Sequence, residues 1–331
     1  MEKRRLGKTN LFVSHLALGT VELGYQYGIG PRNLPSEKEA IQLLRMAVDR
    51  GISFFDTAHF YGCAEERIAK SAIAQVPGIV IATKCGHGIE KDPNITANDL
   101  EKIILYEVEQ SRKILGLEIL DLVLVHGGSA EQIRSGIIIE IMQKLKDQQK
   151  IKHCGISTRG VKAPEAAIDS GFFEVLQVGY SIFDQRLRRS VLPKAKSQGI
   201  GIMARSVFLK GALTSANRFL PEELAELKRG YFEIEKIARK VCVDVPTLAL
   251  CFALAEINID SVLIGTNKRE NLNQALNNYS DDLPFLPELL CELSKYAISD
   301  TAIVDPAYWP PIAVSDVRDG QKLDPHLYEK K

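Results

Sequence analysis

The sequence predicts an α/β fold, in which eight parallel strands, each followed by a helix, close into a TIM (β/α)8 barrel. Short apolar runs without polar alternation recur along the chain, and such runs are typical of strands buried on both faces of a parallel sheet. Amphipathic stretches separate them at intervals of roughly 30 to 40 residues, as expected of repeated βα units. The 331 residues suit one such barrel, because these barrels use roughly 250 residues as one domain.

The expected strands, in chain order, are approximately Leu16–Thr20, Ser53–Asp56, Ile79–Lys84, Leu120–His126, Lys152–Ser157, Val175–Tyr180, Gly201–Ser206 and Ser261–Gly265. Amphipathic stretches lie between them, and several open with Ser, Asn or Pro, which favour helix N-termini. They include Ser36–Arg50, Ala97–Leu115 and Pro221–Val241.

We expect a single domain over residues 1–331, with a hairpin at 1–15, the barrel at 16–283 and a C-terminal extension at 284–331. The hairpin is expected to plug the bottom of the barrel. The extension has one more helical stretch and then a proline-rich segment at 306–311 that carries Trp309, the only tryptophan. Three roles are open for this tail: a cover over or beside the barrel rim, a packing strap, or a dimer contact.

Four polar residues stand where expected strands end and loops begin, namely Asp56, Lys84, His126 and, five residues beyond Asp56, Tyr61. In a closed parallel barrel the carboxyl ends of the strands share one rim, where active sites form. Each residue alone has an ordinary structural explanation. Asp56 can cap a helix or form a turn, Lys84 can reach solvent from a strand end, His126 can be a structural histidine, and Tyr61 can be a packed loop aromatic. The four together favour an active site.

Charge and hydropathy exclude several classes of protein. Lys plus Arg and Asp plus Glu both total 42, so the net charge is zero and no global field favours nucleic acid or a membrane. No stretch approaches roughly 18 consecutive apolar residues, and the basic start lacks the apolar segment of a signal peptide. We expect a cytoplasmic protein with a small-molecule substrate and no nucleic-acid or membrane partner. The oligomeric state is open.

The six cysteines form no CxxC pair and no dense framework, which argues against a metal site and against a disulfide scaffold. Reduced thiols of a cytosolic protein fit this pattern. Cys63 and Cys85 lie beside Tyr61 and Lys84 in the sequence. We interpret them as small buried apolar side chains, and a redox role for them stays open.

From about Arg4 to Asn278 the chain resembles the aldo-keto reductases. The hairpin segment reads Arg-Arg-Leu-Gly-Lys-Thr-Asn-Leu-Phe-Val-Ser, Leu-Gly-Thr stands at 18–20, Phe-Asp-Thr-Ala and Tyr-Gly at 55–62, and Gly-Ile-Ser at 155–157. Runs at 19–29, 183–187 and 204–211 resemble a bacterial branch associated with surface polysaccharide or sugar metabolism. The resemblance implies a barrel enzyme that reduces carbonyl compounds with a nicotinamide cofactor.

The four polar residues can carry this chemistry. Hydride transfer to a carbonyl leaves charge developing on oxygen, so a proton donor must stand there, and Tyr61 is the expected general acid. A tyrosine has an ordinary pKa of about 10, which a neighbouring cation lowers, and Lys84, held by Asp56, is expected to supply that charge. His126 is expected to donate a hydrogen bond to the substrate carbonyl. The resemblance implies the same roles.

The cofactor NADP(H) is implied by the resemblance more than by a phosphate-binding loop, because the chain has no GxGxxG or Walker motif. It implies contacts with the nicotinamide ribose and carboxamide from Thr20, Val21, Asp56, Ser157 and Gln177. It implies contacts with the nicotinamide, the pyrophosphate and the adenosine phosphate from Arg205, Ser206, Val207, Phe208, Gly265, Asn267, Lys268, Asn271 and Gln274.

The chain departs from the family pattern at three places. Arg205 stands where many relatives stack an aromatic ring on the nicotinamide, and its planar guanidinium can also stack. Asn271 falls where relatives that favour the phosphorylated cofactor often carry arginine; Lys268 and Arg269 can still meet a 2′-phosphate, and NAD(H) stays an alternative. His126 is followed by Gly-Gly, which leaves the substrate loop short.

These features predict an NADP(H)-dependent oxidoreductase that reduces an aldehyde, ketone or sugar-derived carbonyl. Candidate walls of the substrate pocket are Tyr25, Tyr27, Phe60 and Trp309. Because fold does not fix function, two alternatives stay open. One is a nicotinamide-binding regulatory subunit with incidental catalysis, and the other is an aldose dehydrogenase that runs the reaction in reverse.

Overall fold

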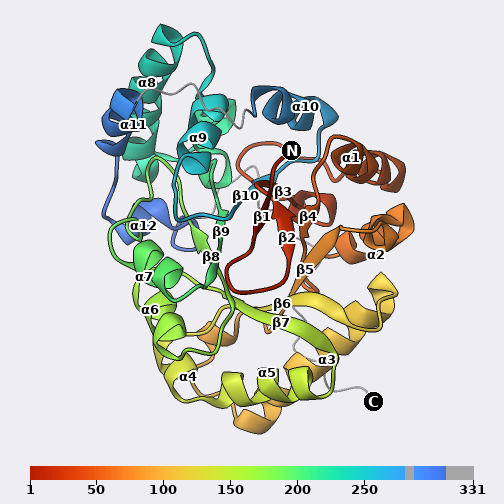
Figure 1. The fold of residues 1–331 in the computed structure, drawn as a ribbon. Coiled ribbons are helices and arrows are strands. Elements are labelled where there is room, and N and C mark those ends of the chain that lie inside the picture. The colour runs from red at the N-terminus through yellow and green to blue at the C-terminus, as the bar shows by residue number, and fades with distance from the viewer. Residues whose placement is uncertain (280–286, 311–331) are drawn as a thin grey trace.

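The barrel strands form where the sequence is an unbroken apolar run. The computed structural model describes residues 1–279 and 287–310, and eight parallel strands close in the order β10-β3-β4-β5-β6-β7-β8-β9 (Figure 1). No expected strand boundary differs from the observed one by more than one residue, and the TIM barrel is confirmed. The strands are β3 (Leu16–Gly19), β4 (Phe54–Asp56), β5 (Val80–Cys85), β6 (Leu120–His126), β7 (Ile151–Ser157), β8 (Val175–Gly179), β9 (Gly201–Arg205) and β10 (Ser261–Gly265).

A helix follows each barrel strand, and together the helices surround the sheet (Figure 1). These helices are α1 (Glu37–Asp49), α2 (Ala64–Ser71), α3 (Ala97–Leu115), α5 (Ile137–Asp147), α6 (Lys162–Asp169), α7 (Val191–Ser197), α9 (Val245–Leu254) and α10 (Arg269–Asn278). Additional helices precede α5 and α9 or follow the barrel, namely α4 (Ala130–Arg134), α8 (Ala225–Lys240), α11 (Pro287–Ser294) and α12 (Thr301–Val304).

Local capping chemistry sets the helix ends. α1 begins after Ser36, whose Oγ accepts a hydrogen bond from Glu39 N while the Glu39 carboxylate bonds to Ser36 N, forming a capping box. α3 has the expected bounds and ends at Gly116, which adopts the left-handed conformation with φ +66°. The expected helix Pro221–Val241 begins later in the structure, because Glu222–Leu224 forms a 3-10 turn before α8.

Helix α9 is not one of the three amphipathic stretches named from the sequence. Its ten residues are almost all apolar, and all but Pro246 are buried, because the helix packs between α8 and β10. Sequence prediction of a helix depends on one apolar face and one polar face, and a helix buried on all sides lacks that pattern.

The strands β1 (Lys3–Arg5) and β2 (Phe12–Ser14) pair antiparallel and form the expected hairpin across the bottom of the barrel. Leu6 and Val13 are fully buried and join the apolar cluster inside the barrel. A Cβ on Gly201 would lie only 2.8 Å from Leu6 Cγ. The first residue of β9 must therefore be glycine for the hairpin to enter.

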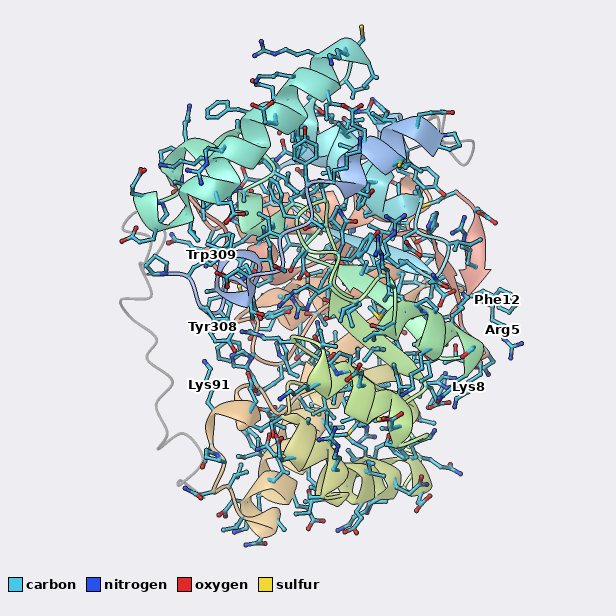
Figure 2. The ribbon with its side chains drawn as sticks, turned by 90° about the vertical axis from the view of Figure 1, so that its left-hand side faces the viewer. Arg5, Lys8, Phe12, Lys91, Tyr308 and Trp309 are labelled. Atoms are coloured by element: carbon cyan, nitrogen blue, oxygen red, sulfur yellow. The ribbon has the colours of Figure 1, made fainter. Side chains whose placement is uncertain are left out.

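The hairpin and the C-terminal segment lie at opposite ends of the barrel. Figure 2 shows Arg5 and Phe12 of the hairpin at one side of the molecule and Lys91 and Trp309 at the other. Residues 280–283 of the expected barrel and 284–286 and 311–331 of the expected extension lie outside the described residues. No helix in the described ranges has both the length and the apolar character needed to cross a membrane.

Alternate residues of each strand face two different cores. In β6, Leu122 and Leu124 belong to the cluster inside the barrel, whereas Val123 and Val125 pack outward beneath the helices. The period of two along a strand therefore decides which side chains reach the rim from inside. In each strand, the side chain that reaches the rim from inside belongs to the residue two positions beyond the last apolar residue that faces the inside of the barrel.

Candidate active site

The period of two brings the expected ionisable residues to the inside of the rim. His126 lies two residues beyond the inward Leu124, and Lys84 lies two residues beyond the inward Ala82. Asp56 occupies the same position at the end of β4. Because the carboxyl ends of parallel strands meet at one rim, the three side chains come together although they are far apart in the sequence.

A buried ion pair joins Asp56 and Lys84. Lys84 Nζ lies 2.7 Å from Asp56 Oδ2 and donates to Thr57 O at 2.8 Å, and the Lys84 side chain is fully buried. Gln177 Nε2 donates to the other Asp56 oxygen at 2.7 Å. Burial lowers the pKa of Lys84, and the negative charge of Asp56 opposes that change. Each charge holds the other in place, since removal of one would leave the other buried and uncompensated.

Tyr61 reaches over this pair from the loop after β4. Lys84 Nζ lies 3.4 Å from Tyr61 Oη and 4.8 Å from the centroid of its ring. The loop is tight: Gly62 adopts φ +55°, and a Cβ on Gly24 would overlap the carbonyl oxygen of Tyr61. Only glycine permits such a close approach of two backbones, so the two glycines set the position of the phenol.

The pKa of Tyr61 differs from the expectation. Burial raises it far above its ordinary value and the charge of Asp56 adds to that rise, while the positive charges of Arg205 and Arg159 oppose it. The expected net lowering is wrong here, because burial and the charge of Asp56 outweigh the neighbouring positive charges. Tyr61 is therefore a neutral phenol with a proton to donate.

His126 stands beside Tyr61 as a neutral imidazole. The two ring centroids are 5.6 Å apart and the rings are nearly perpendicular, at 81°. Burial lowers the pKa of His126 well below its ordinary value, and the positive charge of Lys84 lowers it further. Within the described residues His126 Nδ1 is buried without a hydrogen-bond partner. An N–H there would be an unsatisfied donor, so we assign the proton to Nε2.

A cavity of about 2100 Å³ opens over these residues. Aromatic rings form one wall: Phe60 stacks on His87 with centroids 3.7 Å apart, and the centroids of His87 and His126 are 4.6 Å apart. The cavity is lined by Tyr61 and by all four expected substrate contacts, Tyr25, Tyr27, Phe60 and Trp309. Their contact with a substrate stays a prediction.

Trp309 comes from the segment that follows α12. Its Nε1 donates to Ile303 O at 2.8 Å, and the residue is 8% exposed. Ile298 N donates to Phe183 O at 2.8 Å, which anchors the segment to the loop after β8. The described part of the C-terminal extension therefore lies beside the rim and forms part of the cavity wall.

Most of the expected cofactor contacts line the same cavity, but Thr20 and Asn267 do not. Thr20 uses both its backbone N and its Oγ1 to donate to Asp56 O, at 2.9 and 3.0 Å, and Asn267 Nδ2 donates to Asn33 O at 2.7 Å. The residues that do line it are Val21, Asp56, Ser157, Gln177, Arg205, Ser206, Val207, Phe208, Gly265, Lys268, Asn271 and Gln274. Their contacts with a cofactor stay predictions.

The groove has features that fit a nicotinamide dinucleotide. Gly19 and Gly265 are register partners at the ends of neighbouring strands, so β3 and β10 carry no side chain at that level of the rim. Glu22 lines this groove, and its Oε2 is buried without a hydrogen-bond partner among the described residues. Buried polar atoms normally have partners, and a hydroxyl group of a bound ligand would supply one.

Opposite charges meet at the β10 end of this groove. Glu22 is 9% exposed, and Arg32 Nη1 lies 3.7 Å from its Oε2. Burial raises the pKa of Glu22, while Arg32 and Lys268 oppose that rise. Lys268 directly precedes α10, and a helix N-terminus favours anions. The groove therefore holds both an acid and the cations that a phosphate would meet.

The side chains that line the cavity and that sequence reasoning missed include His87, Glu90, Arg159 and Asp305. Arg159 lies two residues beyond Ser157, so continuing the count of two past the end of β7 would have found it. His87 lies two residues beyond Cys85, which packs outward, so this count does not find His87. A Cβ on Gly127 would overlap Glu90 Oε2, which explains the glycine that follows His126. No local sequence signal indicates Asp305, because tertiary packing brings it to the rim.

The two cysteines near the site differ in exposure. Cys63 is partly exposed and lines the cavity. Cys85 is buried, and burial raises its pKa well above the ordinary value, with the charge of Glu107 adding to the rise. Its thiol stays protonated and is therefore a poor nucleophile.

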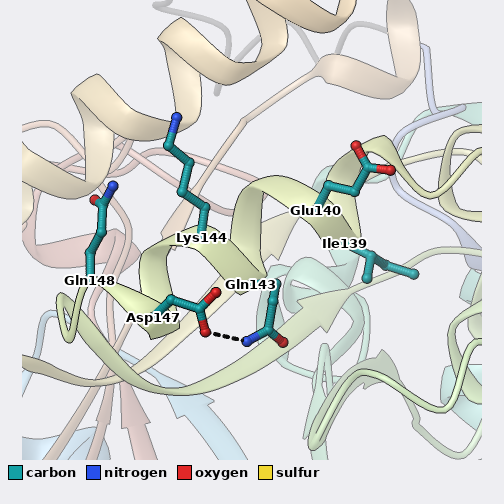
Figure 3. Close-up of a pocket in the computed structure, with 6 residues that line it drawn as sticks. All are labelled: Ile139, Glu140, Gln143, Lys144, Asp147 and Gln148. Carbon is teal, nitrogen blue, oxygen red and sulfur yellow. Dashed lines mark hydrogen bonds between the residues drawn. The ribbon is translucent and has the colours of Figure 1, made fainter.

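A second hollow, of about 560 Å³, lies on the outer face of α5 (Figure 3). Three of its polar side chains are already paired, since Gln143 Nε2 donates to Asp147 Oδ1 at 2.7 Å and Lys144 forms an ion pair with Glu101 of α3. It has no cluster of reactive groups comparable to that at the rim, so the rim is the candidate active site.

Comparison with known proteins identifies the family. The profile of the "Aldo/keto reductase family" matches residues 15–284. L-galactose dehydrogenase of Arabidopsis thaliana is 30% identical over 282 residues, which cover 80% of this chain and 84% of that protein. The NADH-specific methylglyoxal reductase of Escherichia coli (strain K12) is 27% identical over 317 residues, which cover 85% of this chain and 95% of that protein.

Solved structures agree on the fold. The aldo-keto reductase of Bacillus halodurans in its holo form superposes with a TM-score of 0.72 at 23% identity, over 93% of this chain and 99% of that one. The family profile spans the barrel strands and the four residues of the candidate site. The chain belongs to the aldo/keto reductase family and is an NAD(P)H-dependent oxidoreductase.

Proposed function

We propose that the chain uses NADP(H) to reduce an aldehyde, ketone or sugar-derived carbonyl to an alcohol, with Tyr61 as the general acid. The contact of Tyr61 Oη with the buried Lys84–Asp56 pair, at 3.4 Å and beside a large cavity, carries this proposal. We also propose a cytosolic location, because all six cysteines are free, as expected in a reducing compartment.

In this reaction a C–H bond forms at the carbonyl carbon and an O–H bond forms at the oxygen. A bound reduced nicotinamide supplies the hydride. Tyr61 donates its phenolic proton to the oxygen as negative charge develops there. Lys84 lies close enough to stabilise the phenolate that remains. His126 donates a hydrogen bond from Nε2 to the same oxygen and thereby orients the carbonyl.

The most direct test follows the oxidation of NADPH in the presence of a panel of aldehydes and sugar carbonyls. Tyr61→Phe keeps the ring and removes the proton donor, so we expect kcat/KM to fall by roughly 10²- to 10⁴-fold. Tyr25→Phe is the matched control, because it removes a phenol from the same cavity without touching Lys84. Equal activity of Tyr61→Phe and wild type would contradict the assignment of the general acid.

The choice of NADP(H) over NAD(H) is supported by Lys268 and Arg269 at the start of α10, where positive side chains and the helix N-terminus favour a 2′-phosphate. The negative charge of Glu22 in the same groove disfavours binding of a 2′-phosphate. We expect Lys268→Met to raise KM for NADPH more than KM for NADH. An equal change for the two cofactors, or a wild-type preference for NADH, would instead favour NAD(H).

A second candidate function is oxidation of an aldose, and the similarity to L-galactose dehydrogenase favours it. The same residues would act in reverse, with the Tyr61 phenolate accepting the proton. Product analysis after incubation with oxidised cofactor and a series of aldoses distinguishes the two. Formation of a lactone at a higher kcat/KM than any carbonyl reduction would establish the oxidative direction.

A further inference from the structure

We propose that Arg159 forms an anion-binding subsite beside the catalytic residues, and that the preferred substrates are carbonyl compounds that carry a carboxylate or a phosphate. This inference rests on the reductase function proposed above and narrows its substrate class. The position of Arg159, the uneven charge of the cavity walls and the long ion pair of Arg159 all support it.

Arg159 is close to the reacting groups. It lies two residues beyond Ser157, the last residue of β7, and lines the same cavity as Tyr61 and His126. Its positive charge opposes the rise in the pKa of Tyr61 and contributes to the lowered pKa of His126. The guanidinium therefore acts on both side chains. A substrate whose carbonyl oxygen meets Tyr61 would therefore have its remaining groups within reach of Arg159.

The cations on this side of the cavity are incompletely neutralised. Lys84 is balanced by Asp56. Arg205, in contrast, donates to two uncharged oxygens, Thr158 O at 2.8 Å and Ser206 Oγ at 3.2 Å, and forms no ion pair within the described residues. Two guanidinium groups therefore line the cavity near the catalytic phenol.

The ion pair of Arg159 is long and shared. Arg159 Nη1 lies 3.9 Å from Asp305 Oδ1, and the Arg159 side chain is 44% exposed. The same oxygen of Asp305 accepts a hydrogen bond from Ala307 N at 3.1 Å, and the charge of Asp305 also raises the pKa of Arg186. Because half-exposed pairs contribute little, an anion that binds Arg159 through two N–H groups would displace Asp305 at small cost.

The wall on the His126 side carries a buried carboxylate next to the catalytic histidine. The Glu90 carboxylate packs against Gly127, next to His126, and its Oε2 is buried without a hydrogen-bond partner among the described residues. A carboxylate in that place repels an anion and accepts hydrogen bonds from hydroxyl groups. The cavity therefore favours one orientation of the substrate, with the anionic group toward Arg159 and uncharged groups toward Glu90.

Pairs of aldehydes that differ by one anionic group test this inference. The pairs are butanal with 4-oxobutanoate, and glyceraldehyde with glyceraldehyde 3-phosphate. In wild type we expect kcat/KM to be about tenfold or more higher for the anionic member of at least one pair. Arg159→Gln should remove that advantage by raising KM for the anionic member, and should change kcat/KM for the neutral member less. The control Lys91→Gln removes a cation that lines the cavity beside Glu90 and should preserve the advantage.

The two pairs also distinguish the possible anions. An advantage only for 4-oxobutanoate identifies a carboxylate site, and an advantage only for glyceraldehyde 3-phosphate identifies a phosphate site. Asp305→Asn should lower KM for the anionic members, because it removes the competing acid. Equal kcat/KM within both pairs in wild type, or an equal loss for both members in Arg159→Gln, would overturn the subsite. The reductase function would still stand if Tyr61→Phe abolished turnover of the neutral aldehydes.

If no carbonyl were reduced, the proposed function would fail and direct binding would decide on the subsite alone. Calorimetric titration of succinate and of inorganic phosphate into the wild-type protein and into Arg159→Gln provides that measurement. Binding of either anion by wild type and not by the variant supports the subsite. No binding of either anion, or equal binding by both proteins, overturns it.

Discussion

At the bottom of the barrel half-buried polar groups bond to one another, whereas at the rim several buried polar atoms have no hydrogen-bond partner among the described residues. His153, near the start of β7, lies 2.8 Å through Nδ1 from Glu174 and 2.6 Å through Nε2 from Asn10 of the hairpin turn. Lys146 Nζ donates to the same Glu174 at 2.7 Å. This network ties the hairpin, α5 and the strands β7 and β8 together.

The rim contains most of the buried side-chain atoms that lack a hydrogen-bond partner in the described part of the chain. These atoms include Glu22 Oε2, Thr57 Oγ1, Glu90 Oε2, His126 Nδ1, Thr158 Oγ1 and Asn267 Oδ1. Each such atom costs roughly 1–3 kcal/mol, and a bound ligand can recover that cost at Glu22, Glu90 and His126, which line the cavity. The comparison indicates that the bottom holds the fold together and that the rim is completed by its ligands.

The largest expected effect of a rim substitution on both stability and activity comes from Lys84→Met. It leaves Asp56 buried without its cation, so we expect the free energy of unfolding to fall by about 3–5 kcal/mol and turnover to be lost. Denaturant unfolding and NADPH oxidation measure the two effects. The double variant Asp56→Asn with Lys84→Met should regain part of the stability and none of the activity. If the double variant were no more stable than Lys84→Met, the buried charge would not be the cause.

A substitution at the bottom should separate stability from activity. Leu6→Ala opens a cavity under the hairpin, and we expect a loss of about 2–5 kcal/mol with unchanged kcat/KM at temperatures where the protein stays folded. Phe12→Ala, in the same hairpin but 57% exposed, is the control and should change little. Reduced kcat/KM in the folded Leu6→Ala variant would show that the two ends are coupled.

The Glu174 network predicts a pH dependence of stability. Burial raises the pKa of Glu174, but hydrogen bonds from His153 and Lys146 outweigh it and hold the pKa at about 2, below the ordinary 4.5. The contribution is therefore complete above the unfolded pKa and is lost as pH falls toward 2, with at most about 3 kcal/mol involved. We expect wild type to exceed Glu174→Gln in unfolding free energy at pH 7, and this advantage to shrink as pH falls below 4.5 and to be mostly lost at pH 2. A constant difference would contradict this assignment.

The smallest expected effect concerns Thr20, which the sequence placed at the cofactor and the structure places against Asp56 O. Thr20→Val removes one buried hydrogen bond, so we expect a loss of about 1 kcal/mol in stability and an unchanged KM for NADPH. Thermal unfolding and cofactor titration measure both. An increased KM for NADPH would instead support the contact expected from the sequence.

The sequence was sufficient for the barrel because its strands are buried on both faces and read as uninterrupted apolar runs. The positions of Asp56, Lys84 and His126 follow from the period of two along such strands. The raised pKa of Tyr61 could not be predicted from the sequence, because it depends on the burial of the phenol and on the nearby charge of Asp56. Asp305 could not be predicted either, since its position depends on how the C-terminal segment packs on the loop after β8.

The placement of Trp309 gives the protein a built-in optical signal. It is the only tryptophan in the chain, and it lies on the wall of the cavity with its indole nitrogen bonded to Ile303 O. The emission of tryptophan overlaps the absorption of reduced nicotinamides, so energy transfer from this one residue should report the loading of the site. Occupancy can thus be titrated in the unlabelled protein, without any turnover.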